Sequence, residues 1–373
     1  MKYYIIAGEA SGDLHGSNLI KELAKRDDKM DVRCWGGDKM KAAGGHLVKH
    51  FNSLAFMGFA EVLMNLRTIF RNLAFCKKDI LAFQPDAIIL IDYPGFNIRI
   101  AKWAKKNEHL LKGCKIIYYI SPQVWAWKEN RVKSMKKCID KMLVILPFEK
   151  DYYQFKWNWE VEYVGHPLIE EIEKHRQQNS PEKFSDKPII ALLPGSRKQE
   201  ILKKLPIMLE ASRSFPDYQF IVAKAPGTEE SFYQSLLQDF TNVSFVNNKT
   251  YDLLLQAKAA IVTSGTATLE TALFGVPEMV CYKGSYISYQ IGKRLVKVKF
   301  ISLVNLIMNK AVVKELVQND FTLPAVKKEL TALVNDERYR QQLQTDYTAL
   351  WNILSTGGPA SANAAGIITD CLR

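Results

Sequence analysis

The sequence has few cysteines and no long hydrophobic run, and both shortages narrow the class of protein it encodes. No stretch is long and apolar enough to span a bilayer as a helix. The first residues pass directly into a strand-like segment, without the apolar region and cleavage site of a signal peptide. The six cysteines are scattered, with neither metal-binding nor redox spacing. We therefore expect a cytoplasmic protein with reduced thiols.

Patterns that bind metals or nucleic acids are missing as well. The chain contains no zinc module, no aromatic RNA-binding signature and no Asp-x-Asp pair. It also contains neither a repeat of solenoid period nor a low-complexity tract. We therefore expect no metal, no other cofactor and no nucleic-acid partner.

Acidic residues are outnumbered, with 39 Asp and Glu against 51 Lys and Arg, which gives a net charge of +12 at pH 7. Such an excess suits nucleic acid, an anionic membrane surface or phosphorylated substrates. Because the nucleic-acid signatures are absent, the membrane surface and phosphorylated substrates are the favoured partners.

What the chain does contain is an alternation of strands and helices, which is typical of parallel α/β sheets. Its 373 residues fit two such domains. We expect the first domain at 1–168, the second at 185–350 and a C-terminal helix at 351–373, for which packing back on the first domain is one arrangement. The expected strands are Tyr3–Ala7, Val32–Trp35, Ala87–Ile91, Ile116–Ile120, Met142–Leu146, Val161–Val164, Ile189–Leu193, Gln219–Ala223, Val243–Val246, Ala259–Val262 and Glu278–Tyr282.

The first strand opens into a turn with two glycines around a serine, Gly8–Asp13. Glycines let the backbone approach a ligand closely, although a tight turn needs glycine in any case. The strand Ala87–Ile91 is followed by Asp92, whose charge would point into the crevice where such sheets bind ligands. Helix N-capping is the alternative role for Asp92 and for Asn97.

Two further stretches of the first domain each have two interpretations. The tryptophans of 121–127 either fill a gap in the core or form a flat wall for a sugar or acyl group. The segment Phe51–Phe83 is rich in Phe, Leu and Met, with a narrow polar stripe and basic flanks. Such an amphipathic helix either packs in a core or faces lipid.

The second domain contains two strand–turn–helix junctions that suit phosphate. Arg197 follows the strand Ile189–Leu193 and offers a planar, permanently charged fork to a diphosphate. In Ile261–Pro277, a strand stops at hydroxyl residues and Gly265 before a helix begins, so free backbone N–H groups and the helix dipole favour an anion. The alternative is that Ser264 and Thr266 cap the helix and Glu270 completes a capping box.

Six motifs, in this order, closely resemble those of the lipid-A-disaccharide synthases. They are GEASGD (8–13), IDYPGFN (91–97), SPQVWAW (121–127), PGSR (194–197), SGTATLE (264–270) and SLVNL (302–306). They span nearly the whole chain, and their combination is not generic among α/β proteins. Tyr93 and Gly95 stand where the family motif has Ala and Asp.

The resemblance implies an inverting glycosyltransferase of the GT-B architecture, an α/β fold with two Rossmann-like parallel-sheet domains facing across a cleft. It implies transfer of a sugar from UDP-2,3-diacylglucosamine to 2,3-diacylglucosamine 1-phosphate (lipid X). The product would be the β-1,6-linked lipid A disaccharide 1-phosphate, released with UDP. It further implies peripheral association with the anionic inner-membrane surface, and it leaves the oligomeric state open.

The resemblance also assigns residues. Asp92 is the expected catalytic base, with Glu9, Asp13 and His15 as rivals. The residues expected to bind the UDP moiety are Arg197, Ser264, Gly265, Thr266, Ala267, Thr268, Glu270 and Asn305. Those expected to bind the acceptor are Glu9, Ser11, Gly12, Asp13, Asn97, Gln123 and Trp125.

Two other functions would use part of these features. Another GT-B enzyme acting on UDP-GlcNAc, such as an epimerase or a lipid II-type transferase, would share the phosphate-binding residues but would not need the apolar segment 51–83. A non-enzymatic lipid-binding protein would use that segment and leave Arg197 and SGTATLE without a role.

Overall fold

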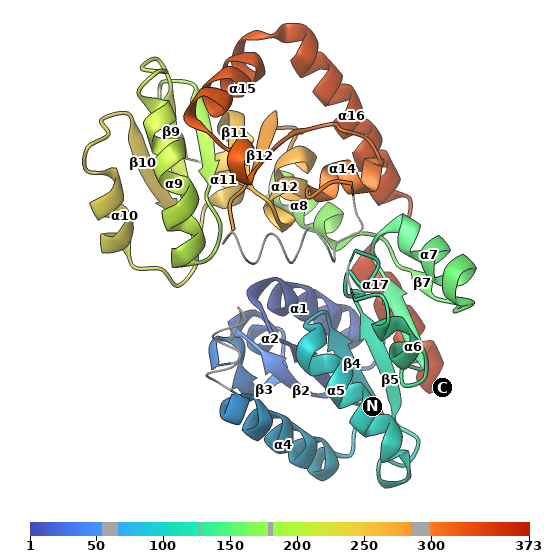
Figure 1. Cartoon of the computed structure of the whole chain (residues 1–373). Helices are drawn as coiled ribbons and strands as arrows, with labels where there is room; N and C mark the ends of the chain where they lie inside the picture. The colour runs from blue at the N-terminus through green and yellow to red at the C-terminus, as the bar shows by residue number, and fades with distance from the viewer. Residues whose placement is uncertain (54–65, 127, 178–181, 285–298) are drawn as a thin grey trace. The chain divides into compact units, whose positions relative to one another are not determined.

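The computed structural model describes residues 1–53, 66–126, 128–177, 182–284 and 299–373 of the chain. These residues form two compact units, both visible in Figure 1. Unit 1 comprises Met1–Pro167 and Leu354–Arg373, whereas unit 2 comprises Leu168–Ile353. Each unit is built on its own parallel sheet, as the alternation of strands and helices predicts.

Unit 1 contains a seven-stranded sheet in the order β3-β2-β1-β4-β5-β6-β7. Its strands are β1 (Lys2–Ala7), β2 (Asp31–Gly36), β3 (His46–His50), β4 (Ala87–Ile91), β5 (Lys115–Tyr119), β6 (Lys141–Val144) and β7 (Glu162–Tyr163). The central strands β1, β4 and β5 are buried on both faces, which accounts for their nearly continuous apolar sequences. The strand order reverses between β1 and β4, so the turns after these two strands are neighbours at the carboxyl edge.

Helices cover both faces of this sheet. On one face, Leu19 and Ala364 pack with Ile5 of β1, and on the other, Ile80 and Ile100 pack with residues such as Tyr4. The C-terminal helix packs against the first helix, and its apolar residues belong to the same core. The helices of unit 1 are α1 (Ala10–Ala24), α2 (Asp38–Ala42), α4 (Leu66–Phe83), α5 (Pro94–Lys106), α6 (Arg131–Lys136), α7 (Pro147–Trp157) and α17 (Ala360–Leu372).

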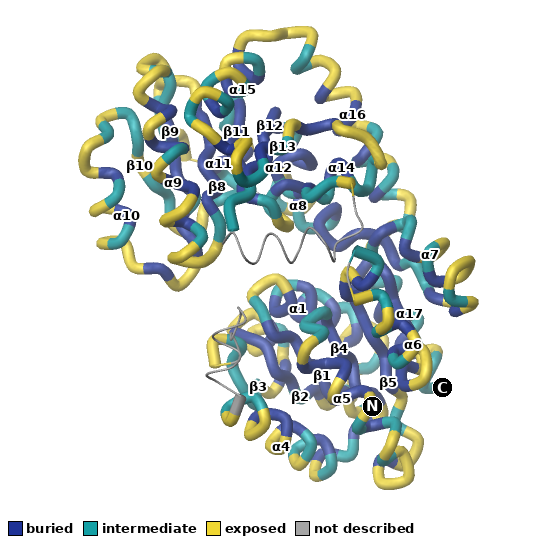
Figure 2. Tube along the Cα trace, in the orientation of Figure 1, coloured by how far each residue is buried: buried dark blue, intermediate teal, exposed yellow. Residues whose placement is uncertain are grey.

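Unit 2 contains a six-stranded parallel sheet in the order β10-β9-β8-β11-β12-β13. Its strands are β8 (Ile189–Leu193), β9 (Gln219–Lys224), β10 (Val243–Asn247), β11 (Ala257–Thr263), β12 (Glu278–Tyr282) and β13 (Lys314–Val317). Its helices, of which the first and last cross the limits of the unit, are α8 (Pro167–Gln177), α9 (Lys198–Ser212), α10 (Glu230–Leu237), α11 (Thr250–Gln256), α12 (Thr266–Leu273), α14 (Leu303–Met308), α15 (Leu323–Asn335) and α16 (Glu337–Ser355). The central strands β8, β11 and β12 are dark blue in Figure 2, because helices cover the sheet on both faces.

The sequence does not predict β3 or β13, which lie at one edge of each sheet. β3 reads HLVKH and β13 reads KELV, so neither has the apolar run that marks the central strands. An edge strand pairs on one side only and tolerates charged residues there, and such residues also discourage unwanted pairing with other chains.

The amphipathic segment 51–83 is described only in part, since residues 54–65 lie outside the described residues. Phe51–Ser53 forms a short 3-10 helix, and α4 follows. One face of α4 packs in the core of unit 1 through Leu73, Cys76 and Ile80. Phe70 is 61% exposed and Phe75 46% exposed, so this helix combines a core face with two exposed phenylalanines on different sides of it.

Candidate active site

The turn after β4 holds Asp92 in a strained backbone conformation. Asp92 and Tyr93 have φ values of 42° and 47°, a left-handed conformation that costs a non-glycine residue about 1–3 kcal/mol. The Asp92 carbonyl oxygen accepts hydrogen bonds from the Asn97 amide at 2.8 Å and the Tyr118 hydroxyl at 2.5 Å. The fold therefore fixes the backbone of Asp92 in a conformation that runs against its local preference, as is common at functional sites.

The environment of Asp92 suits a group that takes up a proton near neutral pH. Burial, and to a smaller extent the negative charge of Glu9, raise the pKa of Asp92 to about 7, although the hydrogen bond from the Tyr93 backbone N–H acts in the opposite direction. A carboxylate with such a pKa is matched to general-base catalysis. The carboxyl ends of β1 and β4 thus bring together the turn that holds Glu9 and the turn that holds Asp92.

The first turn, Gly8–Asp13, approaches Asp92 through its glycine. A Cβ atom on Gly8 would lie 2.3 Å from the Tyr93 ring, so only glycine lets these two turns pack together. Gly95, by contrast, has no heavy atom within 4 Å of the place for a Cβ atom. The residues at which the chain departs from the family motif therefore differ: Tyr93 is packed against the first turn, and Gly95 is in open space.

Other residues of the first turn have structural contacts. Asp13 is buried, and its carboxylate accepts backbone N–H groups of Gly37 at 2.7 Å, Met40 at 3.0 Å and Lys39 at 3.2 Å. It therefore caps α2, which leaves it poorly placed to act as the base. Gly12 is buried, and a Cβ atom there would lie 3.0 Å from that of Ala7.

Of the other predicted acceptor residues, Ser11 and Gln123 are exposed, whereas Asn97 is fully buried. The Asn97 amide donates to the carbonyl groups of Ile6, Ile91 and Asp92. Asn97 lies inside α5, whose N-cap residue is Tyr93, and its amide donates to carbonyl groups, so the capping role considered for Asn97 is wrong. Asn97 instead joins the ends of β1 and β4 and orients the Asp92 turn.

His15, a rival candidate for the base, is buried in the second turn of α1. Burial lowers its pKa to about 4, and the charge of Lys39 lowers it further. His166, which follows β7, is likewise buried, and burial together with His15 lowers its pKa to about 3. Both imidazoles are therefore neutral at physiological pH.

The loop after β5 places Trp125 beside a buried carboxylate. The Trp125 indole N–H donates to Glu149 Oε1 at 3.1 Å, and its ring makes an edge-to-face contact with Phe148 at 4.9 Å. Trp125 is half-buried, and Trp127 lies outside the described residues. The Trp125 ring is thus held by polar and aromatic contacts, with part of its surface open to solvent.

Glu149 is a residue that the sequence interpretation missed. It stands in the first turn of α7, after β6, and its Oε2 accepts the backbone N–H of Leu146 at 3.1 Å. Burial raises its pKa to about 7, and the nearby charge of Asp92 contributes in the same direction. A carboxylate just after a buried strand was a usable signal, because the same rule identifies Asp92.

In unit 2, Arg197 lies at the junction of β8 and α9. Arg197 is exposed, occupies the N-cap position of α9 and forms an ion pair with Glu200 at 3.1 Å. Gly195 has a φ of 115°, and a Cβ atom there would lie 3.0 Å from the Glu200 carboxylate. The junction therefore presents a guanidinium group at the carboxyl edge of the sheet.

The N-terminus of α12, after β11, is open to a ligand. Gly265 and Thr266 are exposed, Ala267 is half-buried, and nothing lies within 4 Å of a Cβ atom built on Gly265. The N-cap residue of this helix is Gly265, which has no side chain, so the capping alternative for Ser264 and Thr266 is wrong. The N-cap residue therefore offers no side-chain acceptor to the first backbone N–H groups of α12.

The remaining polar side chains of this motif have partners elsewhere. Ser264 donates to the carbonyl of Ile301 at 3.0 Å, and the buried Thr268 donates to that of Gly265 at 2.9 Å. Glu270 accepts the Tyr251 hydroxyl at 3.0 Å rather than completing a capping box, and burial raises its pKa.

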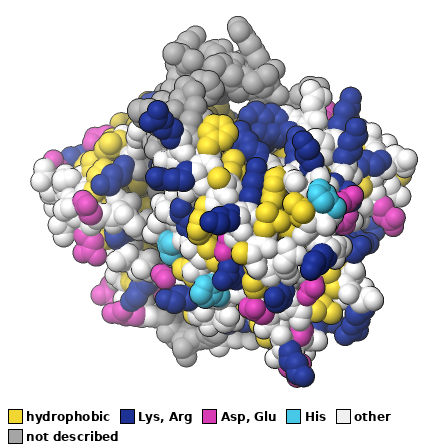
Figure 3. All heavy atoms as spheres, turned by 90° about the horizontal axis from the view of Figure 1, so that it is seen from below, with side chains coloured by type: hydrophobic (Ala, Val, Ile, Leu, Met, Phe, Trp, Pro, Cys, Tyr) yellow, Lys and Arg dark blue, Asp and Glu magenta, His cyan; other side chains and the backbone are white. Residues whose placement is uncertain are grey.

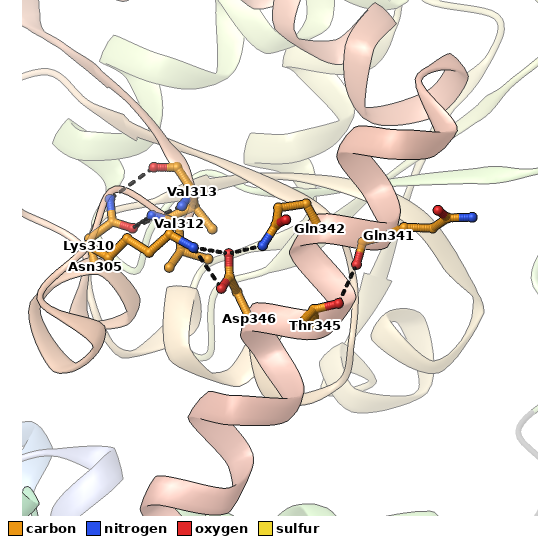
Figure 4. A network of polar contacts seen from close by, with 8 residues as sticks. All are labelled: Asn305, Lys310, Val312, Val313, Gln341, Gln342, Thr345 and Asp346. Atoms are coloured by element: carbon orange, nitrogen blue, oxygen red, sulfur yellow. Dashed lines mark hydrogen bonds and ion pairs between the residues drawn. The ribbon is translucent and has the colours of Figure 1, made fainter.

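Asn305 is buried, and all four hydrogen-bonding positions of its amide are occupied. Oδ1 accepts from the N–H groups of Val312 and Val313, and Nδ2 donates to the Val313 carbonyl and to Glu315. Figure 4 shows the hydrogen bonds of Asn305 with Val312 and Val313. It also shows Lys310, which donates to both carboxylate oxygens of Asp346 at 2.9 Å. Asn305 is therefore in a position to hold the loop that contacts Ser264, and it has no amide group left for a nucleotide.

No group of three or more His, Cys, Asp or Glu side chains in the described part of the chain is arranged to hold a metal ion. No helix among the same residues combines the length and hydropathy needed to cross a membrane.

Comparison with known proteins gives consistent results. Residues 3–358 match the family model described as lipid-A-disaccharide synthetase. The lipid-A-disaccharide synthase of Syntrophus aciditrophicus (strain SB) is 38% identical over 375 residues, covering 98% of this chain and 96% of that protein. The lipid-A-disaccharide synthase of Coxiella burnetii (strain Dugway 5J108-111) is also 38% identical, over 99% of this chain and 98% of that protein.

Solved structures show the same fold at low identity. The UDP-GlcNAc 2-epimerase of Neisseria meningitidis bound to UDP-GlcNAc matches with a TM-score of 0.66 at 13% identity, covering 100% of this chain and 99% of that one. The glycotransferase of kitacinnamycin matches with a TM-score of 0.69 at 14% identity, with coverage of 100% and 99%. These likenesses confirm the expected GT-B architecture.

Proposed function

The chain belongs to the lipid-A-disaccharide synthase family of glycosyltransferases, and from this premise we propose its substrates and the roles of its residues. The donor is UDP-2,3-diacylglucosamine and the acceptor is 2,3-diacylglucosamine 1-phosphate. The products are the β-1,6-linked disaccharide 1-phosphate and UDP. The main support for this chemistry is Asp92, which follows a buried strand and has a pKa of about 7.

The reaction is a single displacement with inversion. The 6-hydroxyl oxygen of the acceptor attacks the anomeric carbon of the donor, and the bond from that carbon to the diphosphate breaks. Asp92 takes the hydroxyl proton, which a positioned base does with a gain of about 10²–10⁴ in rate. Its fixed backbone conformation supports this role, since the Asn97 and Tyr118 side chains hold the carbonyl of the same residue.

The leaving diphosphate is stabilised from unit 2. Arg197 supplies a charged fork, and the uncapped N-terminus of α12 supplies backbone N–H groups at Gly265, Thr266 and Ala267. Ser264, Thr268 and Asn305 act through the loop geometry that they stabilise. This supports a division in which unit 2 binds the nucleotide and unit 1 binds the acceptor.

The protein acts at the cytoplasmic surface of the inner membrane, where both acylated sugars reside. Phe70 and Phe75 of α4 are exposed next to the basic residues Arg71 and Lys78, a pattern typical of helices at an anionic interface. Figure 3 shows one face of the molecule, on which Lys and Arg side chains stand among hydrophobic ones. This supports peripheral association with anionic lipid.

The decisive test is product analysis by mass spectrometry after the protein is mixed with UDP-2,3-diacylglucosamine and lipid X. We expect the tetraacyl disaccharide 1-phosphate and an equal amount of UDP. A parallel reaction with water-soluble UDP-GlcNAc separates the alternatives, because turnover of that compound alone would indicate an epimerase or a different transferase. If no product forms and UDP does not protect the protein against thermal unfolding, the protein is a lipid carrier.

A further inference from the structure

Glu149 is a buried carboxylate at the candidate active site that the proposed chemistry leaves without a role. It is 1% exposed and stands on α7, at the carboxyl end of β6. One carboxylate oxygen accepts the backbone N–H of Leu146, and the other accepts the Trp125 indole N–H. The Leu146 contact is that of a glutamate at the third position of α7 capping the N-terminus of the helix, so the contact with Trp125 is the one that a capping role does not explain.

The group that Glu149 holds is the Trp125 indole, which belongs to the unit where the acceptor is proposed to bind. Trp125 is half-buried, follows β5 and packs edge-on against Phe148. β5 lies between β4, which ends at Asp92, and β6, which leads to Glu149. The indole and the two carboxyl groups therefore follow three adjacent strands at one edge of the sheet. A fixed aromatic ring beside a base is suited to pack against the apolar face of a sugar.

On these contacts, and resting on the proposed acceptor site, we propose that Glu149 is a positioning residue that fixes the Trp125 ring as a wall for the acceptor sugar beside Asp92. The ring then sets the distance between the acceptor 6-hydroxyl and the base. A misplacement of about 1 Å at such a site costs on the order of 10²-fold in rate.

Glu149 and Asp92 also influence each other's ionisation. The Asp92 charge raises the pKa of Glu149, and the interaction of two charges acts equally on both partners. The titratable groups that face this pair are Glu9, Tyr93, Tyr118 and Tyr153. Removing the Glu149 charge therefore makes Asp92 easier to ionise, so the rise of kcat/KM with pH moves to lower pH.

The test compares Glu149→Gln, Trp125→Phe and the double variant in the disaccharide-forming assay with lipid X. Each single variant is expected to lower kcat/KM for the acceptor by about tenfold to a hundredfold with unchanged affinity for UDP. The double variant is expected to be no slower than the slower single one, because both changes break one contact. The acid limb of the pH profile is expected to shift only where Glu149 is replaced.

Glu329→Gln is the matched control, because Glu329 accepts the Tyr339 hydroxyl at 2.9 Å in unit 2. Normal acceptor kinetics in Glu149→Gln, or losses that add in the double variant, would overturn the proposal. If Glu149→Gln does not fold, Trp125→Phe, which keeps an aromatic ring but loses the indole N–H together with the five-membered part of the ring, must by itself raise the acceptor KM. A wild-type protein that makes no disaccharide would instead contradict the proposed function.

Discussion

At the residue scale, the turn Asp92–Tyr93 combines strain with an unusual protonation equilibrium. Two consecutive non-glycine residues with positive φ persist because Asn97 and Tyr118 hold the Asp92 carbonyl and the Tyr93 ring packs over Gly8. Strain of this kind is retained where the surrounding contacts exceed its cost. Here they orient the carboxyl group whose pKa burial raises to about 7.

Replacing Asp92 by Asn tests its role as base. Turnover is expected to fall by about 10²–10⁴ while UDP affinity is retained, since Asn is nearly isosteric. In the wild type, kcat/KM should rise with pH through about 7, because only the ionised carboxyl accepts a proton, and this rise should vanish in the variant.

Asp140→Asn serves as the control, because Asp140 precedes β6 at the opposite edge of the sheet and accepts the Ile116 N–H. Near-normal turnover in Asp92→Asn beside a collapse in Glu9→Gln would move the base to the first turn.

Arg197→Ala tests the diphosphate contact in unit 2. We expect weaker UDP binding by about tenfold or more, since a charge-assisted hydrogen bond contributes about 1.5–3 kcal/mol. Isothermal calorimetry with UDP measures this directly. Arg213→Ala is the control, because Arg213 follows the same helix and pairs with Glu210 at 3.1 Å, as Arg197 pairs with Glu200. If the two variants bind UDP with equal affinity, Arg197 is not part of the UDP site.

The sequence identifies most residues near the candidate site, but it does not separate those that touch a ligand from those that hold the loops. Asp13 and Asn305 stand in motifs as prominent as that of Asp92, yet their hydrogen bonds go to the backbone of distant segments. Partners 24 residues away in one case and 8 in the other are invisible in a local pattern. Glu149 was missed for a related reason, since its partner Trp125 comes from another loop.

At the scale of elements, the proposed acceptor site and the proposed nucleotide site are built from the same motif, in which a buried strand is followed by a turn and a helix. β4 leads to Asp92, β8 to Arg197 and β11 to Gly265. Such strands could be predicted from the sequence, because burial on both faces gives them nearly continuous apolar sequences. The edge strands β3 and β13 could not, because their pairing depends on a neighbour and not on their own composition.

The exposed phenylalanines of α4 predict membrane binding. The double variant Phe70→Ser/Phe75→Ser should bind anionic vesicles about tenfold more weakly than the wild type, since the exposed parts of the two rings together equal about one side chain, whose burial contributes on the order of 1.5 kcal/mol. Binding of both proteins should fall with added salt. Vesicle sedimentation measures the partition.

Phe155→Ser on α7 is the control for this experiment, because Phe155 is 81% exposed on a different helix. If the α4 variant binds vesicles as tightly as the wild type, other parts of the chain make the membrane contact. Residues 54–65, which the sequence places in the same apolar segment, lie outside the described residues, and their lipid contact stays a prediction.

At the scale of the whole molecule, the stability of unit 2 should depend on Glu278. This residue is fully buried in β12, and neither carboxylate oxygen has a hydrogen-bond partner in the described part of the chain. Burial raises its pKa well above the ordinary value. Its contribution to stability is therefore complete below about pH 4.3, the unfolded pKa, and is lost as pH rises through the folded pKa.

Glu278→Gln should accordingly gain free energy of unfolding relative to wild type as pH rises, by about 1.4 kcal/mol for each unit between the two pKa values. Urea unfolding followed at several pH values gives the two curves. Glu210→Gln, at an exposed position of α9, should run parallel to the wild type. A Glu278→Gln curve that is also parallel would mean that Glu278 finds a partner when ionised.

The division of the chain has a consequence for synthesis. Unit 1 takes its last helix, α17, from residues that follow the whole of unit 2. Ala364 and Ile368 of that helix are fully buried in the core that contains Ile5 and Leu19. On the ribosome, the part of this core that α17 covers therefore stays exposed while nearly two hundred residues are translated, although α1 already packs on the same face of the sheet. At about 5–20 residues per second, that exposure lasts on the order of ten seconds or more, long enough for chaperones to matter.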